Sequence, residues 1–217
     1  MRKQIFENGE FYHVYNRGVD KRIIFQEDYD VFRFIQGMKD FNTVNPIGSI
    51  YEKSFLKDPI QSSDSELVNI IAYCLNPNHY HFILEQIVEG GISKYLGKLA
   101  GGYTYYFNEK YDRSGSLFQG PFKVKPIKSN DYLLHASAYV NLNDRVHQLD
   151  RHDSGLKSKS SWSEYTEEGI KNELCKKAVV LDQFKSKNAY KNYAEDALGI
   201  MLEKKLADKE LVDMLME

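Results

Sequence analysis

The chain has 217 residues, of which 42% are hydrophobic and 13% aromatic, enough for the core of one catalytic-sized domain with an appendage. The net charge of −2 excludes a uniformly basic protein, so any nucleic-acid binding has to come from local charge. The two cysteines lie far apart without CxxC spacing, which indicates reduced thiols. Without an apolar run of membrane-spanning length or a signal-peptide core, we expect a soluble cytoplasmic protein with no membrane partner.

The first third of the chain alternates between regular and irregular segments. Apolar alternation over residues 11–17 predicts a strand that Gly18 ends, and near-helical apolar spacing predicts a helix over 28–38. Residues 42–66 are rich in Asn, Pro, Gly and Ser, which is typical of a loop, with a short strand at 50–51.

Two central strands follow around a turn. The apolar run 68–75 predicts a buried strand, Asn76-Pro77-Asn78 is turn chemistry, and 79–84 predicts the returning strand. Alternate residues of a strand face the same side, so His79 and His81 project together and can bind one divalent cation. A solvated strand face that binds nothing is the alternative for such a pair.

The second half of the chain adds further elements. We predict a helix over 94–108 capped by Ser93, a strand over 122–127, and a helix over 131–142 capped by Ser129 or Asn130. Residues 147–163 resemble a polar linker, and a helical pattern follows. The order predicts an α+β, ferredoxin-like (split βαβ) antiparallel sheet with helices on one face, plus a C-terminal helical extension. The predicted domains are residues 1–148 and 149–217.

Local charge favours a nucleic-acid partner. Seven basic and two acidic residues between Gly91 and Asn130 give this segment a net charge of +5, interleaved with Tyr and Phe. This composition suits phosphate neutralisation and base stacking, although a solvated helix face over core aromatics is the alternative. With one strand arginine, the candidate DNA-binding residues are Arg17, Lys94, Lys98, Arg113, Lys123, Lys125 and Lys128.

The last predicted helix of the domain carries Tyr139 and Asn143 at i, i+4, on one helix face. A tyrosine beside a metal-bound phosphate can attack phosphorus, but a phenol with a pKa near 10 needs a nearby cation to lose its proton. The Asn143 carbonyl oxygen is an acceptable hard ligand, beside two imidazoles, for Mg²⁺ or Mn²⁺. By itself, Tyr139 is equally compatible with a packed aromatic residue.

Five segments together resemble a known family. They are Phe11–Gly18 followed by Ile24-Phe25, Asn76–His81, Gly115–Lys123, Ala138–Asn143 and Ser160–Tyr165. They are similar to motifs of the REP-associated tyrosine transposases, within the single-tyrosine HUH (insertion-sequence-200-like) superfamily, and the resemblance spans about residues 8–165. One departure is Asn143-Asp144, where the family usually has Asn-Pro.

The resemblance implies a metal-dependent single-stranded DNA endonuclease and transferase. His79, His81 and Asn143 would bind the cation, and Tyr139 would form a 5′-phosphotyrosine bond and leave a free 3′-hydroxyl. It also implies hairpin DNA as the partner and a homodimer. Two other hypotheses stay open: a non-catalytic or domesticated nucleic-acid-binding module on the same fold, and a metal hydrolase of small phosphate substrates.

Overall fold

The computed structural model describes residues 5–45, 65–147 and 157–215. Its centre is a five-stranded antiparallel sheet in the order β4-β1-β3-β2-β5. The strands are β1 (Phe11–Arg17), β2 (Val68–Asn76), β3 (His79–Gln86), β4 (Lys123–Ile127) and β5 (Lys159–Ser160). The alternation of β1, α1, β2, β3, α3 and β4 along the chain confirms the predicted ferredoxin-like α+β fold.

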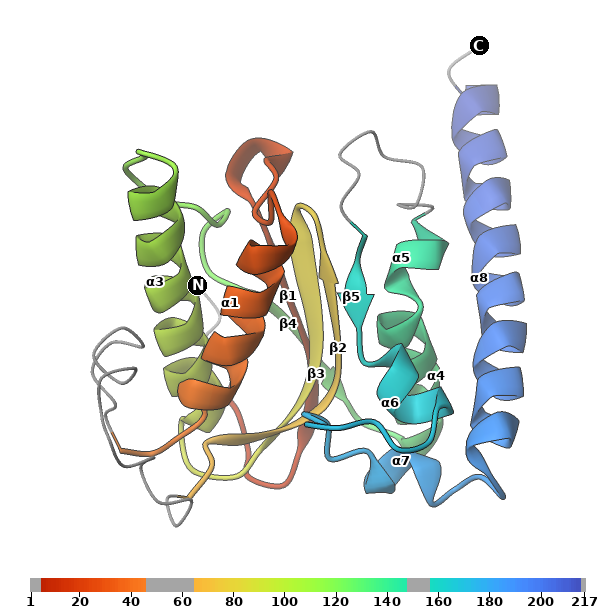
Figure 1. Ribbon diagram of the computed structural model, residues 1–217. Coiled ribbons are helices and arrows are strands. Elements are labelled where there is room, and N and C mark those ends of the chain that lie inside the picture. Colours follow the sequence, from red (N-terminus) through yellow and green to blue (C-terminus); the bar gives the residue numbers. More distant parts are fainter. Residues whose placement is uncertain (1–4, 46–64, 148–156, 216–217) are drawn as a thin grey trace.

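Helices cover both faces of this sheet (Figure 1), which corrects the prediction of helices on one face. On one side lie α1 (Asp28–Asp40) and α3 (Gly91–Lys110), and on the other side lies α4 (Asn130–Asn141). The shorter helices α5, α6 and α7 and the long α8 follow, with bounds Asn143–Val146, Trp162–Thr166, Ala178–Leu181 and Lys187–Leu215. Because nearly every residue of β2 and β3 is buried, both faces of the sheet have to be covered.

The alternation along β3 assigns each face its role. Tyr80 and Phe82 face α1, where their ring centroids lie 5.6 and 6.4 Å from that of Phe34. His79 and His81 face the opposite side, toward α4, as the strand pattern predicts. The apolar core therefore fills one side of the central strand, while the other side carries the polar groups of the candidate site.

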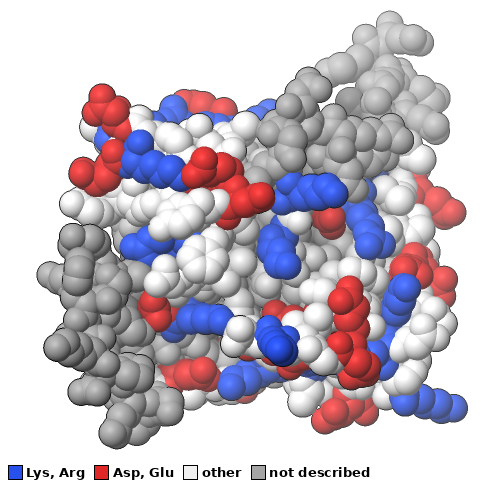
Figure 2. Space-filling model, viewed as in Figure 1, with Lys and Arg blue, Asp and Glu red and all other residues white. Residues whose placement is uncertain are grey.

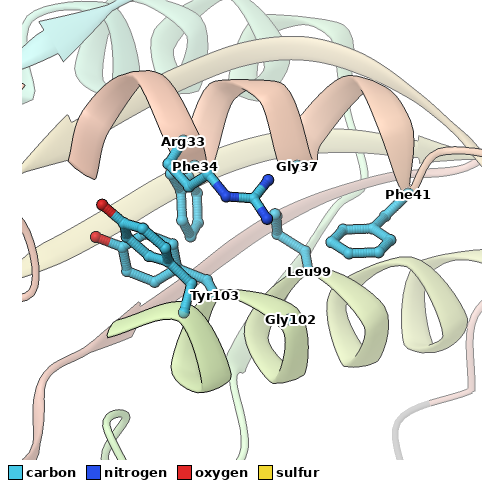
Figure 3. Close-up of a pocket in the computed structure, with 8 residues that line it drawn as sticks. Arg33, Phe34, Gly37, Phe41, Leu99, Gly102 and Tyr103 are labelled. Atoms are coloured by element: carbon cyan, nitrogen blue, oxygen red, sulfur yellow. The ribbon is translucent and has the colours of Figure 1, made fainter. Parts of the chain in front are cut away.

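Two glycines let α1 and α3 approach each other. A Cβ on Gly102 would lie 2.7 Å from the Phe41 ring, and one on Gly37 would lie 3.0 Å from Leu99. Figure 3 shows the Arg33 side chain lying across the small hollow that remains between the two helices. This hollow is a packing seam and is too small for a substrate.

One helix start differs from its prediction. Helix α3 begins at Gly91 with Gly90 as its N-cap, so Ser93 lies inside the first turn and is not the cap. Gly90 has a φ of 68°, and a Cβ on Gly91 would lie 2.2 Å from the Leu67 carbonyl oxygen. Only glycine tolerates both the left-handed backbone and this close approach, and these demands set the start of the helix. The predicted cap Ser129 of α4 is confirmed, because its hydroxyl accepts a hydrogen bond from the Tyr132 amide.

Part of the predicted linker belongs to the sheet. β5 pairs with β2, and the following Ser161 accepts a hydrogen bond from the Tyr73 amide at 3.0 Å. Tyr190 of α8 is fully buried and accepts a hydrogen bond from Asn141 of α4 at 2.8 Å. The sequence analysis did not predict β5, because the polar serines indicated a solvated linker, whereas Ser160 and Ser161 hydrogen-bond to backbone groups of the fold. The expected strand at residues 50–51 lies outside the described residues, as do residues 148–156 of the linker. Across the described ranges, no helix is both long and apolar enough to cross a membrane.

Candidate metal and tyrosine site

Three imidazoles, the histidine cluster of His13, His79 and His81, lie side by side on β1 and β3. His13 Nε2 and His81 Nδ1 share a hydrogen bond of 2.9 Å. The Nδ1–H of His79 donates to the Asn78 side-chain oxygen at 2.6 Å. With Nδ1 engaged in this way, His79 and His81 have Nε2 as the candidate ligating atom, and the group bound to Nδ1 orients the ring. Asn78 therefore forms part of the turn and also orients the His79 ring.

Burial keeps these imidazoles neutral. It lowers the pKa of His13 to about 4, with the Lys125 ammonium adding to the shift. Burial also lowers the pKa of His79 to about 4, although the nearby Asn143 side chain by itself raises it. The pKa of His81 falls well below its usual range for the same reason, and the neighbouring His13 lowers it further. Neutral imidazole is the metal-binding form, so the cluster needs no deprotonation at pH 7.

Asn143 brings an amide oxygen to the same place. Its Oδ1 lies 3.3 Å from His79 Nε2, and the Asn76 amide donates to both atoms, at 2.8 and 2.9 Å. Asn143 is fully buried, and its own Nδ2 has no hydrogen-bond partner among the described residues. The Asn143 side chain is thus held with its oxygen toward His79, while its nitrogen has no hydrogen-bond partner among the described residues.

These positions fit a shared cation. Two atoms that bind one ion at about 2.1 Å lie roughly 3.0–3.4 Å apart for angles between 90° and 109°, which includes the 3.3 Å of His79 Nε2 and Asn143 Oδ1. At that bond length, two imidazole ligands have ring centres roughly 4.5–5.2 Å apart, and those of His79 and His81 are 5.2 Å apart. No group of three or more His, Cys, Asp or Glu side chains converges as a metal-binding set within the described ranges. The amide oxygen is therefore the third candidate ligand.

Tyr139 lies beside this group in the same chain. Its ring centroid is 5.7 Å from that of His81 and 5.8 Å from that of His13, in edge-on contacts. Burial raises the pKa of Tyr139, and the neighbouring Asn143 side chain partly offsets that shift. Helix α4 ends at Asn141, and Asn143 begins the short α5, yet Tyr139 and Asn143 stay on the side that faces the histidines. The structure therefore brings together the four residues that the sequence analysis selected.

His79, His81 and Tyr139 line a pocket of about 500 Å³, which we call the tyrosine pocket, whereas Asn143 is fully buried behind them. Arg17 and Lys123 line it, as predicted DNA contacts, and so do Lys21 and His147, which the sequence analysis did not select. The His147 and His79 ring centroids are 5.8 Å apart. His147 follows Asn143 by four residues, a helical spacing that could have revealed it. Lys21 lies between the predicted strand over 11–17 and the predicted helix over 28–38, where the sequence analysis assigned no element.

The other predicted DNA contacts are scattered. Lys125 is exposed on β4, on the side of His13, whereas Arg113 lines a second pocket. Lys94 and Lys98 lie in the first half of α3, and the Lys98 ammonium donates to the Thr43 carbonyl at 2.8 Å. Lys128 is exposed beyond the end of β4. Figure 2 shows basic and acidic side chains interspersed on the face it views, so the positive charge does not gather there into one patch.

A ferredoxin-like sheet with a histidine pair on its central strand, faced by a tyrosine on α4, has the arrangement that the resemblance to single-tyrosine transposases implies. Residues 51–143 match the model of the family described as "Transposase IS200 like", a segment that includes His79, His81, Tyr139 and Asn143. The predicted resemblance to this family is confirmed.

A solved structure shares the fold. The chain is similar to the protein in "Structure of the REP associates tyrosine transposase bound to a REP hairpin", with a TM-score of 0.52 and 14% sequence identity over 76% of this chain and 83% of that one. No curated protein matches the chain in sequence. The family match and the shared fold together support a transposase role.

Proposed function

We propose that this protein is a metal-dependent single-stranded DNA endonuclease and transferase that cleaves hairpin-associated DNA and rejoins strands. The observation that carries the proposal is the position of the Tyr139 ring, 5.7 Å from His81, with Asn143 Oδ1 and His79 Nε2 beside it at 3.3 Å from each other. The candidate nucleophile and the two imidazole ligands thus line one pocket together with Arg17, Lys21 and Lys123. The resemblance to hairpin-binding relatives supports DNA as the substrate.

His79, His81 and Asn143 would hold Mg²⁺ or Mn²⁺, which supplies Lewis-acid polarisation of the scissile phosphate when bound. The Tyr139 oxygen attacks phosphorus and forms a P–O bond, while the bond from phosphorus to the 3′ oxygen breaks. The phenol proton passes to solvent, and the departing oxygen takes up a proton to become a 3′-hydroxyl. The chain keeps the 5′ phosphate as phosphotyrosine, so rejoining needs no nucleotide cofactor.

The cations around the pocket would position the strand. Arg17 and Lys123 line the pocket itself, and Lys125 follows on the same strand face. Arg113, Lys94, Lys98 and Lys128 would contact DNA farther from the reacting phosphate. We also propose a homodimer, because the resembled family implies one. Tyr139 lies beside the histidines of its own chain, so a partner subunit is not needed to complete the pocket. Light scattering of the full chain with and without DNA measures this.

The decisive experiment uses labelled single-stranded hairpin DNA with Mg²⁺ or Mn²⁺. We expect a covalent protein–DNA adduct that Tyr139→Phe abolishes. Tyr132→Phe is the matched control, because Tyr132 lies on the same helix outside the tyrosine pocket, and it should leave the adduct unchanged. Adduct formation by Tyr139→Phe would refute the assigned nucleophile.

The alternatives predict different results. A non-catalytic DNA-binding module would bind the hairpin without forming an adduct with either metal. A hydrolase of small phosphate substrates would turn over a phosphate ester without a covalent intermediate. The second alternative leaves the basic, aromatic-rich segment between Gly91 and Asn130 without a role.

A further inference from the structure

A second pocket lies between the segment after β1 and the C-terminal part of α3. It has a volume of about 480 Å³, within the range of ligand sites, and we call it the guanidinium pocket. Its lining residues are Arg22, Ile23, Phe25, Gln26, Phe107 and Arg113. The described lining thus holds two guanidinium groups and a neutral amide, and no carboxylate that would oppose an anion.

Its two arginines have unused donor capacity. Arg22 Nε is buried and has no hydrogen-bond partner among the described residues. A buried donor without a partner is costly, and the guanidinium fork matches the oxygens of a phosphate. Arg113 is held in place, because it donates to the Asn108 side chain at 2.9 Å and lies over the Phe107 ring at 5.8 Å. A fixed guanidinium and an unsatisfied one therefore line the same cavity.

The remaining lining suits a base. Ile23 is 42% exposed, and the buried rings of Phe25 and Phe107 lie behind it in the pocket lining. Proteins that bind single strands combine cations for the backbone with apolar or aromatic surfaces for the bases. A free phosphate ion would leave this apolar surface unused.

The chain itself joins the guanidinium pocket to the tyrosine pocket. Lys21 lines the tyrosine pocket and the next residue, Arg22, lines the guanidinium pocket. This division depends on a strained turn, in which Asp20 and Lys21 have φ values of 53° and 60°. Such left-handed conformations in non-glycine residues are strained and cluster at functional sites.

The turn before His79 fixes the distance between the pockets. The Asn78 side chain donates to the Lys21 carbonyl at 3.2 Å, and the Pro77 carbonyl accepts from the amides of Ile24 and Phe25 at 2.7 and 3.1 Å. The residues that orient the candidate metal ligands therefore also anchor the segment that carries Arg22. A nucleotide held in one pocket is at a set distance from a phosphate in the other.

We propose that the guanidinium pocket binds one unpaired nucleotide of the same DNA strand that Tyr139 cleaves, and so selects which phosphate reaches the tyrosine. Arg22 and Arg113 take its phosphate, and its base packs against the exposed Ile23. This inference rests on the proposed function, and deepens it by naming a specificity site that is separate from the reacting groups.

The test measures binding of a hairpin oligonucleotide with a single-stranded flank, by fluorescence anisotropy in EDTA so that no cleavage occurs. We expect Arg22→Gln and Arg113→Gln each to weaken binding roughly 5- to 20-fold and to reduce the slope of log K against log salt by about 0.7. Arg33→Gln is the matched control, since Arg33 is equally half-buried but lies in the seam between α1 and α3, and its affinity should change less than about twofold. Gln26→Ala, at an exposed position of the lining, is a second probe if Arg22→Gln melts early.

Two outcomes would overturn the inference. If the wild type forms the Tyr139 adduct but both arginine variants bind like Arg33→Gln, the proposed function stands and the pocket is not a DNA site. A scan of the flank with abasic nucleotides should find one position where the base matters in the wild type and not in Ile23→Ser. Absence of such a position would reduce the pocket to a general phosphate contact and refute base selection. If the wild type neither binds nor cleaves the hairpin, the proposed function itself fails.

Discussion

The Asn76 amide group is positioned where it competes with a cation. It is fully buried and donates to both His79 Nε2 and Asn143 Oδ1, which are two of the three candidate ligands. Asn76→Ala removes both hydrogen bonds and leaves His79 Nε2 and Asn143 Oδ1 with only the 3.3 Å contact between them. At about 1–3 kcal/mol for each unsatisfied group, we expect the free energy of unfolding in EDTA to fall by about 2–6 kcal/mol.

Metal binding should respond in the opposite direction. In the wild type, a cation has to displace two hydrogen bonds whose net value is about 0.5–1.5 kcal/mol each. Without them, the affinity for Mn²⁺ should rise about tenfold, since a factor of ten corresponds to about 1.4 kcal/mol. Calorimetric titration with Mn²⁺ and urea unfolding with and without the metal measure the two effects.

The matched control is Asn69→Ala, on the same strand. Asn69 donates to Glu85 at 2.8 Å, away from the candidate metal site, so its replacement should leave the Mn²⁺ affinity unchanged. A tenfold loss of Mn²⁺ affinity in Asn76→Ala would refute the reasoning, because it would show that Asn76 supports the ligands and does not compete with the ion.

Three further predictions follow from the same geometry. His81→Ala should abolish cleavage and retain most of the DNA affinity, because the phosphate contacts come from the basic side chains; equal losses of binding and adduct would contradict this. The pKa values of the histidine cluster are lowered in the folded protein, so the unfolded chain binds more protons between about pH 6.5 and 4. The free energy of unfolding should therefore fall by several kcal/mol as the pH drops through that range. A free energy of unfolding that does not change with pH in EDTA would contradict this prediction. Gly102→Ala would press a methyl group against Phe41 and should lower the free energy of unfolding by about 1–3 kcal/mol. Gly97→Ala places its methyl group where no atom lies within 4 Å, so it should stabilise α3 by about 0.5–1 kcal/mol. Equal shifts of the melting temperature in the two variants would contradict the packing argument.

The sequence was most informative where local periodicity and turn chemistry agreed. The alternation in β3 predicted that His79 and His81 share a face, and the structure places both toward α4. The i, i+4 spacing of Tyr139 and Asn143 predicted one helix face, and the relation holds even though the helix is interrupted at Leu142. These features depend on backbone geometry over a few residues, which the sequence specifies directly.

Long-range pairing escaped the sequence analysis. His13 reaches His81 because β1 and β3 are neighbours, across 68 positions of the chain, and no local pattern encodes that contact. The predicted linker contributes β5, which pairs with β2, and the next residue, Ser161, hydrogen-bonds to the backbone of Tyr73, 88 positions earlier in the chain. The same limit applies to Arg22, whose place in a second pocket follows from the strained turn at Asp20 and Lys21.

By itself, the sequence determined the strand and helix order, the paired imidazoles and the tyrosine with its amide partner, because each is a local pattern with a fixed backbone period. The tertiary structure decided that these groups meet, that helices cover both faces of the sheet, and which cations line the tyrosine pocket. Those outcomes depend on which strands pair and on which buried surfaces need covering, and both are settled by the free energy of the whole packed chain.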